Sequence, residues 1–302
     1  MTEYAIETHG LSVYYGRHRG ILNVDLRVEQ GEVFGFLGPN GAGKTTTQRV
    51  LMDIIRPTAG EARIFGLDCQ KEGITARERV GYLPGELAMY ESMRVRRFFR
   101  MYASLQKGNS DPGYWQTLSN RLELDTGRRI GQLSRGNKQK VGVVTAFMNK
   151  PDLLILDEPT TGLDPLIQQT VMEMVREANR AGATVFFSSH ILPEVQAVCD
   201  RVGIIREGQL VATERVEDLM TQHFKRVRLC FASIPPDDAF TQEGITVMAR
   251  DGQAITLEIR QDLPQVMAEA ASYGITDIET IHVSLEEIFL AYYGRGNGGD
   301  HA

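Results

Sequence analysis

The stretch GPNGAGKTT, Gly38 to Thr46, decides the fold, because it matches the pattern G-x-x-x-x-G-K-[ST] of a phosphate-binding loop. An apolar run at residues 32–37 predicts a short buried strand before the loop, and apolar residues at helical spacing predict a helix through residue 55 after it. Glycines at such a turn let the backbone aim its N–H groups inward, which forms an anion site at the helix N-terminus. The pattern predicts that Lys44 reaches the β- and γ-phosphates of a nucleotide and that the Thr45 hydroxyl holds Mg²⁺.

The composition is that of a soluble globular protein, with 302 residues, 42% hydrophobic and 24% charged. The length suggests about two domains. No window approaches the ~18 consecutive apolar residues of a membrane span, and the N-terminus lacks the features of a secretory signal. A net charge of −6 argues against a broad nucleic-acid-binding surface. Three distant cysteines predict structural thiols in a reducing compartment, so we expect a cytosolic protein or one held at a membrane by a partner.

A second apolar run, residues 153–158, ends in the carboxylates Asp157 and Glu158. An unbroken apolar run predicts a strand buried on both faces of a parallel sheet, and ligands collect at the carboxyl ends of such strands. Asp157 therefore suits the Mg²⁺ shell, and Glu158 suits the polarisation of an attacking water. His190 follows another such strand, residues 184–189, and its place at the same sheet edge favours a position near the γ-phosphate over simple packing.

Two further features admit both a structural and a functional interpretation. Ser134 begins a helical pattern in LSRGNKQK, residues 133–140, where its hydroxyl suits a helix N-cap and equally a phosphate contact. The helical pattern at residues 91–105 carries a group of cations that suits either a solvated face or a binding role. These cations are Arg94, Arg96, Arg97 and Arg100.

The composition changes after about residue 219, and the later segments carry no recognisable chemistry. The patterns predict a strand at 227–231, a hairpin at 246–259 around Asp251-Gly252, a helix at 263–272, a strand at 278–283 and a helix at 284–292. We therefore expect an ATPase domain at residues 1–220, an accessory α+β domain at 221–294 and a disordered tail at 295–302.

Taken in order, these motifs resemble the ATP-binding subunit of ABC transporters over residues 3–220. The discriminating element is LSRGNKQ, which is similar to the LSGGQ signature of that family. Gly162-Leu163-Asp164 resembles its D-loop, and Ser189-His190 resembles its switch histidine. The resemblance implies an α/β P-loop NTPase cassette with a mixed central sheet, an antiparallel β layer and a helical subdomain, followed by the small α+β domain.

In that family two subunits close head to tail on two ATP molecules. The resemblance therefore implies ATP and Mg²⁺ as cofactors and two partners, a second ATPase subunit and an integral membrane permease, without nucleic acid. It places Ser134 and Gly136 on the γ-phosphate of the opposite site, gives Asp164 a coupling role, and makes Tyr15 the adenine-stacking residue, with Tyr14 as the alternative. The implied catalytic residues are Glu158 and His190, the metal ligands are Thr45 and Asp157, and the nucleotide contacts are Tyr15, Gly38, Pro39, Asn40, Gly41, Ala42, Gly43, Lys44, Thr45, Thr46, Ser134, Gly136 and Asp164.

The C-terminal region and the ending Ser-Leu-Glu-Glu-Ile-Phe, residues 284–289, resemble the accessory region of ABC-2 type drug and antibiotic exporters. This likeness implies an ATPase at the cytoplasmic side of the membrane that powers efflux. One alternative is a soluble ABC ATPase acting on nucleic acid or ribosomes, which the single cassette and the missing coiled coil between Lys44 and Asp157 disfavour. An importer ATPase is the other alternative, and the exporter-like ending disfavours it.

The sequence departs from the family at the Q-loop, where Leu83-Pro84-Gly85-Glu86 replaces the usual Leu-Pro-Gln. The glutamine that contacts Mg²⁺ and water in the family is absent, so either Glu86 or water fills a gap in the metal shell. We expect water, because another carboxylate beside Asp157, Glu158 and a triphosphate adds repulsion. Arg135 in place of a signature glycine is a milder departure.

Overall fold

The computed structural model describes residues 4–105, 113–222, 225–260 and 262–281. The chain forms two compact units, one spanning residues 1–215 and the other beginning at Val216. Each unit buries its own hydrophobic core.

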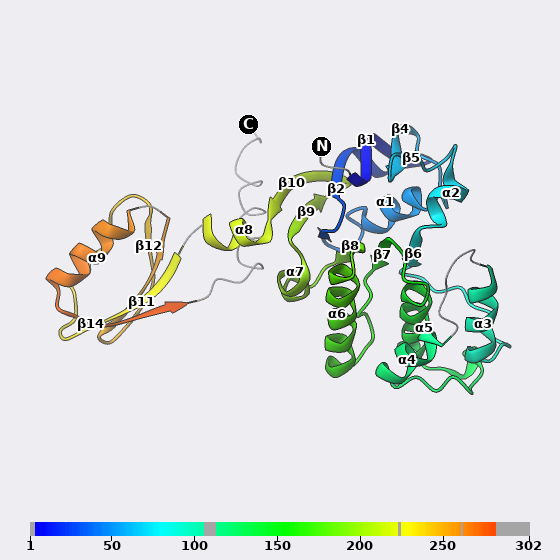
Figure 1. Ribbon diagram of the computed structural model, residues 1–302. Helices are drawn as coiled ribbons and strands as arrows, with labels where there is room; N and C mark the ends of the chain where they lie inside the picture. Colours follow the sequence, from blue (N-terminus) through cyan, green and yellow to red (C-terminus); the bar gives the residue numbers. More distant parts are fainter. Residues whose placement is uncertain (1–3, 106–112, 223–224, 261, 282–302) are drawn as a thin grey trace. The chain divides into compact units, whose positions relative to one another are not determined.

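Two sheets form the framework of the first unit (Figure 1). The antiparallel layer has the order β2-β1-β4-β5, from β2 (His18–Glu29), β1 (Tyr4–Tyr15), β4 (Ala59–Ile64) and β5 (Leu67–Asp68). The central sheet has the order β10-β9-β3-β8-β7-β6, from β10 (Gln209–Arg215), β9 (Arg201–Arg206), β3 (Val33–Leu37), β8 (Thr184–Ser189), β7 (Leu153–Asp157) and β6 (Val80–Leu83). It is parallel except for the β9–β10 hairpin, and every residue of β3, β7 and β8 is buried, as the unbroken apolar runs predict. The expected mixed sheet and antiparallel layer are confirmed.

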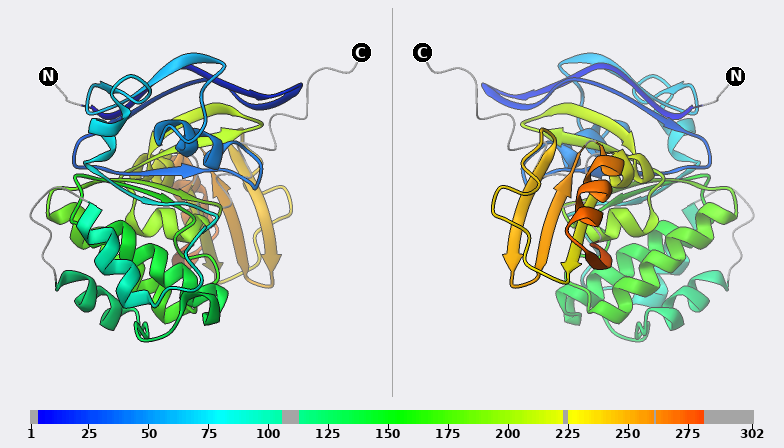
Figure 2. Two further views of the ribbon diagram at one scale, coloured as in Figure 1. Left: turned by 90° about the vertical axis from the view of Figure 1, so that its right-hand side faces the viewer. Right: turned by 90° about the vertical axis from the view of Figure 1, so that its left-hand side faces the viewer.

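Helices cover both faces of the central sheet. Helix α1 (Lys44–Leu51) lies between the two sheets (Figure 2), while α5 (Arg135–Phe147) and α6 (Pro165–Arg180) lie on the opposite face of the central sheet. The remaining helices of this unit are α2 (Gly73–Arg77), α3 (Val95–Leu105), α4 (Tyr114–Arg121), the short 3-10 helix η1 (Ile130–Gln132) and α7 (Leu192–Val198). Helices α3 and α4 lie beside α5 and form the expected helical subdomain (Figure 1).

Two helix boundaries differ from the sequence expectation. Helix α1 ends at Leu51 and does not reach residue 55, because Asp53 adopts the left-handed region at φ 53° and Ile54 is 56% exposed. Helix α3 begins at Val95 and not at residue 91, since the N–H of Val95 donates to the Arg128 carbonyl oxygen instead of joining an earlier turn.

The second unit begins with α8 (Val216–Gln222) and contains a four-stranded antiparallel sheet of order β12-β13-β11-β14. Its strands are β11 (Lys225–Phe231), β12 (Ile245–Asp251), β13 (Ala254–Ile259) and β14 (Ile275–Ile281), and α9 (Leu263–Ser272) packs on the sheet. The expected hairpin and helix are confirmed, whereas the last strand begins at Ile275 and not at residue 278. The predicted helix at 284–292, the exporter-like ending and the predicted tail at 295–302 lie outside the described residues.

Candidate nucleotide site

The phosphate-binding loop joins β3 to α1 as the sequence predicts. Gly43 is the N-cap of α1 and adopts φ 110°, a conformation that residues with a side chain rarely take. A Cβ added at Gly38 would lie 2.4 Å from the carbonyl oxygen of Ile205, so the loop needs glycine there for close approach to the central sheet. Helix α1 has no side-chain cap, so the N–H groups of its first turn are available to an anion.

Lys44 lies in the centre of this loop with only 5% of its side chain exposed. Its Nζ donates to the carbonyl oxygen of Gly38 at 2.6 Å and to that of Pro39 at 3.2 Å, and it lies 3.6 Å from Glu158 Oε1. Burial lowers the pKa of Lys44 below the ordinary lysine value of 10.5, although the carboxylates of Glu158 and Asp157 act in the opposite direction. The loop therefore holds a partly desolvated cation whose partners are carbonyl oxygens and one carboxylate.

Thr45 and Asp157 meet at the edge of the central sheet. The Thr45 Oγ1 donates to Asp157 Oδ2 at 2.7 Å, and the Ser188 Oγ donates to Asp157 Oδ1 at 2.6 Å, which fixes the carboxylate. Hydroxyl and carboxylate oxygens are the ligands that Mg²⁺ prefers, so this pair fits the expected metal. The described chain holds no group of three or more His, Cys, Asp and Glu side chains that could bind a metal alone. A metal at this pair would therefore take its other ligands from phosphate or water.

Glu158 follows β7 and points toward His190. The His190 Nδ1 lies 3.0 Å from Glu158 Oε1, and the Thr161 Oγ1 donates to Glu158 Oε2 at 3.2 Å. Glu158 itself adopts the left-handed region at φ 48°, where a non-glycine residue costs about 1–3 kcal/mol and often marks a functional site. Its N–H donates to the Ser188 carbonyl oxygen at 3.1 Å, so the neighbouring strand holds this strained backbone in place.

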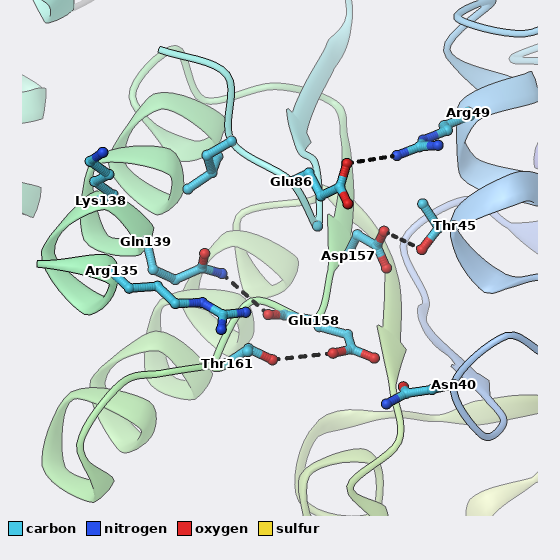
Figure 3. Close-up of a pocket in the computed structure, with 12 residues that line it drawn as sticks. Asn40, Thr45, Arg49, Glu86, Arg135, Lys138, Gln139, Asp157, Glu158 and Thr161 are labelled. Carbon is cyan, nitrogen blue, oxygen red and sulfur yellow. Dashed lines mark hydrogen bonds and ion pairs between the residues drawn. The ribbon is translucent and has the colours of Figure 1, made fainter. Parts of the chain in front are cut away.

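A pocket of about 540 Å³ opens beside these groups, and its size is in the usual range for a small-molecule site. Figure 3 shows Thr45 hydrogen-bonded to Asp157 at the pocket, with Asn40 on the loop and Glu158 beside Thr161. The pocket brings together the predicted residues Asn40, Thr45, Asp157 and Glu158, and cationic side chains of α1 and α5 also line it.

The Q-loop position lies next to Asp157. A Cβ added at Gly85 would lie 2.8 Å from Asp157 Oδ2, so a side chain at this position would crowd the carboxylate in this conformation. Glu86 lines the pocket, but its side chain is 90% exposed and its carboxylate lies 3.5 Å from the Arg49 guanidinium (Figure 3). Water rather than Glu86 in the metal shell therefore stays a prediction.

Other predicted residues lie outside the residues that line the pocket. Tyr15 is 45% exposed, and its hydroxyl lies 3.4 Å from Thr46 Oγ1, so a ring face is available next to the loop. Ser134 caps α5 by accepting from the Asn137 N–H at 3.3 Å, and Asp164 caps α6 by accepting from the Ile167 N–H at 3.1 Å. Both side chains thus have a structural role within one chain.

Sequence reasoning missed a carboxylate that joins two parts of the site. Glu194 on α7 accepts from the Thr160 Oγ1 at 2.6 Å and from the Ser189 Oγ at 2.9 Å. It therefore connects the loop after Glu158 to the residue before His190. Its position in a short helix is the only signal in the sequence, and that signal does not distinguish it from a solvated residue.

The chain is similar to known proteins over nearly its whole length. A family model described as ABC transporter matches residues 21–161. The bacitracin transport ATP-binding protein BcrA of Bacillus licheniformis is 30% identical, over 97% of this chain and 99% of that protein. The daunorubicin/doxorubicin resistance ATP-binding protein DrrA of Streptomyces peucetius is 34% identical, over 96% of this chain and 93% of that protein.

A solved ATP-binding subunit of an ABC transporter has a TM-score of 0.66 and 30% identity, over 72% of this chain and 92% of that chain. In the described part of this chain, no helix has the length and apolar character needed to cross a membrane. The fold, the P-loop geometry and these likenesses agree, and the chain belongs to the ABC transporter family as an ATP-binding subunit that hydrolyses ATP.

Proposed function

We propose that this chain powers an exporter that moves a drug, an antibiotic or another amphipathic compound through a separate membrane permease. The observation that carries the proposal is the full-length likeness to proteins named for bacitracin transport and for daunorubicin/doxorubicin resistance, which covers 97% and 96% of this chain. This similarity extends over the second unit, which is not part of the ATP-binding cassette itself. We propose residues 1–220 as the ATPase domain and 221–294 as an accessory domain of such exporters.

The P-loop would bind the triphosphate of ATP. Its contacts are the backbone of residues 38–43, the Lys44 ammonium and the hydroxyl-bearing Thr46, while Tyr15 offers its exposed ring to the adenine. Lys44 now donates to loop carbonyls, so it can turn to phosphate oxygens without leaving its buried position. This exchange replaces neutral acceptors with charged ones, which strengthens the hydrogen bonds of the ammonium.

We propose that Thr45 and Asp157 hold Mg²⁺, which would neutralise charge on the phosphates. The support is the 2.7 Å contact between their oxygens and the hydrogen bond from Ser188 that orients Asp157. Asp157 is 1% exposed, and a buried carboxylate needs such partners to stay charged.

Glu158 would take the proton of the attacking water as the general base. Its side chain is 24% exposed, so water can reach it, and Thr161 fixes its second oxygen. The His190 ring beside Glu158 Oε1 would orient the carboxylate and face the γ-phosphate. Glu158 and His190 are therefore our proposed catalytic residues.

We propose that a second ATPase subunit binds head to tail and contributes Ser134 and Gly136 to the γ-phosphate, with Asp164 between the two sites. The assembly would sit at the cytoplasmic face of the membrane on its permease, without nucleic acid. Hydrolysis would remove the γ-phosphate that both subunits hold and reopen the dimer.

Affinity purification of the full chain from membranes, followed by identification of the proteins that accompany it, tests this proposal. We expect an integral membrane permease, and we expect Lys44→Ala to abolish drug resistance when the pair is produced in a sensitive host. Lys71→Ala is the matched control, because that lysine is 81% exposed and is not among the residues that line the pocket. Co-purification of ribosomal proteins or nucleic acid without a permease would overturn the proposal.

A further inference from the structure

Five exposed arginines on and beside α3 make no ion pair or side-chain hydrogen bond with another described residue. They are Arg96, Arg97, Arg100, Arg128 and Arg129, and we call them the arginine patch. Their neighbour Arg94 differs, because its guanidinium donates to the carbonyl oxygen of Gly127 and so supports the fold. The five others have no such structural explanation.

Two segments bring the arginine patch together. Arg96, Arg97 and Arg100 occupy the exposed face of α3, opposite the buried side chains of Val95, Phe98 and Phe99. The loop before η1 lies against the start of this helix, since Arg94 and Arg129 form an antiparallel bridge and the Val95 N–H donates to the Arg128 carbonyl oxygen at 3.1 Å. Both loop arginines therefore lie next to the first turn of α3, at the outer side of the helical subdomain (Figure 1).

The local charge is opposite to that of the whole protein. Residues 94–105 and 125–129 hold six arginines and one acidic residue, Asp125, while the whole chain has a net charge of −6. Helix α3 has no acidic residue in its first turn, where the helix dipole disfavours cations. Neither helix stability nor internal pairing accounts for these charges, which leaves solvent or an external anion as their partner.

We propose that the arginine patch binds the anionic headgroups of the lipid bilayer that holds the permease. The proposal rests on the proposed function, which brings the chain to a membrane. Clusters of about four to eight basic side chains are sufficient for anionic lipid recognition, and guanidinium groups match phosphate geometry. Charge complementarity carries the choice of occupant, because the arginine patch is purely cationic and the phosphates of anionic lipids form a continuous anionic surface. An acidic protein segment is the alternative that the experiment distinguishes from lipid.

Vesicle co-sedimentation of the purified full chain tests the proposal. We compare vesicles of phosphatidylcholine alone with vesicles that also contain phosphatidylglycerol, at low and high salt. The wild type should bind only the anionic vesicles, and salt should weaken that binding. The variant Arg96→Glu/Arg100→Glu should lower partition by about 30-fold or more, which corresponds to about 1 kcal/mol for each arginine lost.

The control is Arg56→Glu/Arg215→Glu, two exposed arginines outside α3 that also make no ion pair or side-chain hydrogen bond with another described residue and undergo the same change of charge. It should keep most of the vesicle binding. Absent binding by the wild type at low salt, or equal losses in both variants, would overturn the proposal. Stronger binding to soluble poly-glutamate than to vesicles, lost in the α3 variant, would assign the patch to an acidic protein segment instead. ATP hydrolysis measured on the same samples separates a failure of this proposal from a failure of the nucleotide site.

Discussion

Replacement of Glu158 by glutamine tests the chemistry of the site most directly. The amide has the shape of the carboxylate and can still accept from Thr161, but it cannot take a proton from water. Loss of a general base costs about 10²–10⁴-fold in rate, or about 3–5.5 kcal/mol in the activation barrier. The substitution also removes the negative charge that lies 3.6 Å from Lys44 Nζ and competes with phosphate for that cation. We therefore expect kcat to fall by about 10²–10⁴-fold and ATP affinity to stay equal or rise.

Phosphate release reports the rate for this variant, and a fluorescent nucleotide analogue reports the affinity. Glu173→Gln is the control, because that side chain is 61% exposed on α6 and remote from the pocket-lining residues. His190→Ala should lower kcat as well, and the double variant should fall little below the lower single variant, since the two side chains act through one hydrogen bond. Hydrolysis by Glu158→Gln at close to the wild-type rate would show that another group activates the water.

Four further results are expected. Lys44→Ala should weaken ATP binding at least tenfold, because charge-assisted hydrogen bonds contribute about 1.5–3 kcal/mol each, and unchanged affinity would refute the P-loop assignment. Wild-type ATP affinity should fall as pH rises through a Lys44 pKa below 10.5, since only the charged amine binds phosphate; a flat profile up to that pH would contradict this. Glu194→Gln should lower kcat about tenfold with KM for ATP nearly unchanged, whereas an equal rise in KM would place the effect on binding. Gly85→Gln should reduce Mg²⁺-dependent hydrolysis by crowding Asp157, while Glu86→Ala should be nearly silent, and a faster Gly85→Gln variant would refute the close contact.

Sequence patterns predicted the elements whose formation depends on residues that are close together in the chain. Unbroken apolar runs identified β3, β7 and β8 because strands buried on both faces of a parallel sheet require them. The N-cap at Ser134 was predictable for the same reason, since the serine hydroxyl accepts from an N–H only three residues away. The end of α1 was not predictable, because apolar residues continue at helical spacing while Asp53 takes a left-handed conformation.

Long-range contacts explain the rest. Nothing near Gly85 in the sequence shows that a side chain there would crowd the carboxylate of Asp157. The role of Glu194 depends on two hydroxyl groups from different loops, so only the folded chain reveals it. Glycine and glutamate are common residue types, so in both cases only the position of the residue in the folded chain indicates its role.

The first turn of α5 lies against the loop that contains Gly162 within this chain. A Cβ added at Gly136 would lie 2.6 Å from the carbonyl oxygen of Gly162, so glycine at this position is needed for internal packing as well as for the proposed phosphate contact. The Gln139 Nε2 donates at 3.2 Å to the carbonyl oxygens of Glu158 and Pro159, which joins the same helix to the strained residue at the end of β7. A γ-phosphate that draws in α5 from the opposite subunit would therefore move Gly162 and the backbone of Glu158 with it. In the proposed dimer, this contact would be a route by which one nucleotide site adjusts the proposed catalytic carboxylate of the other.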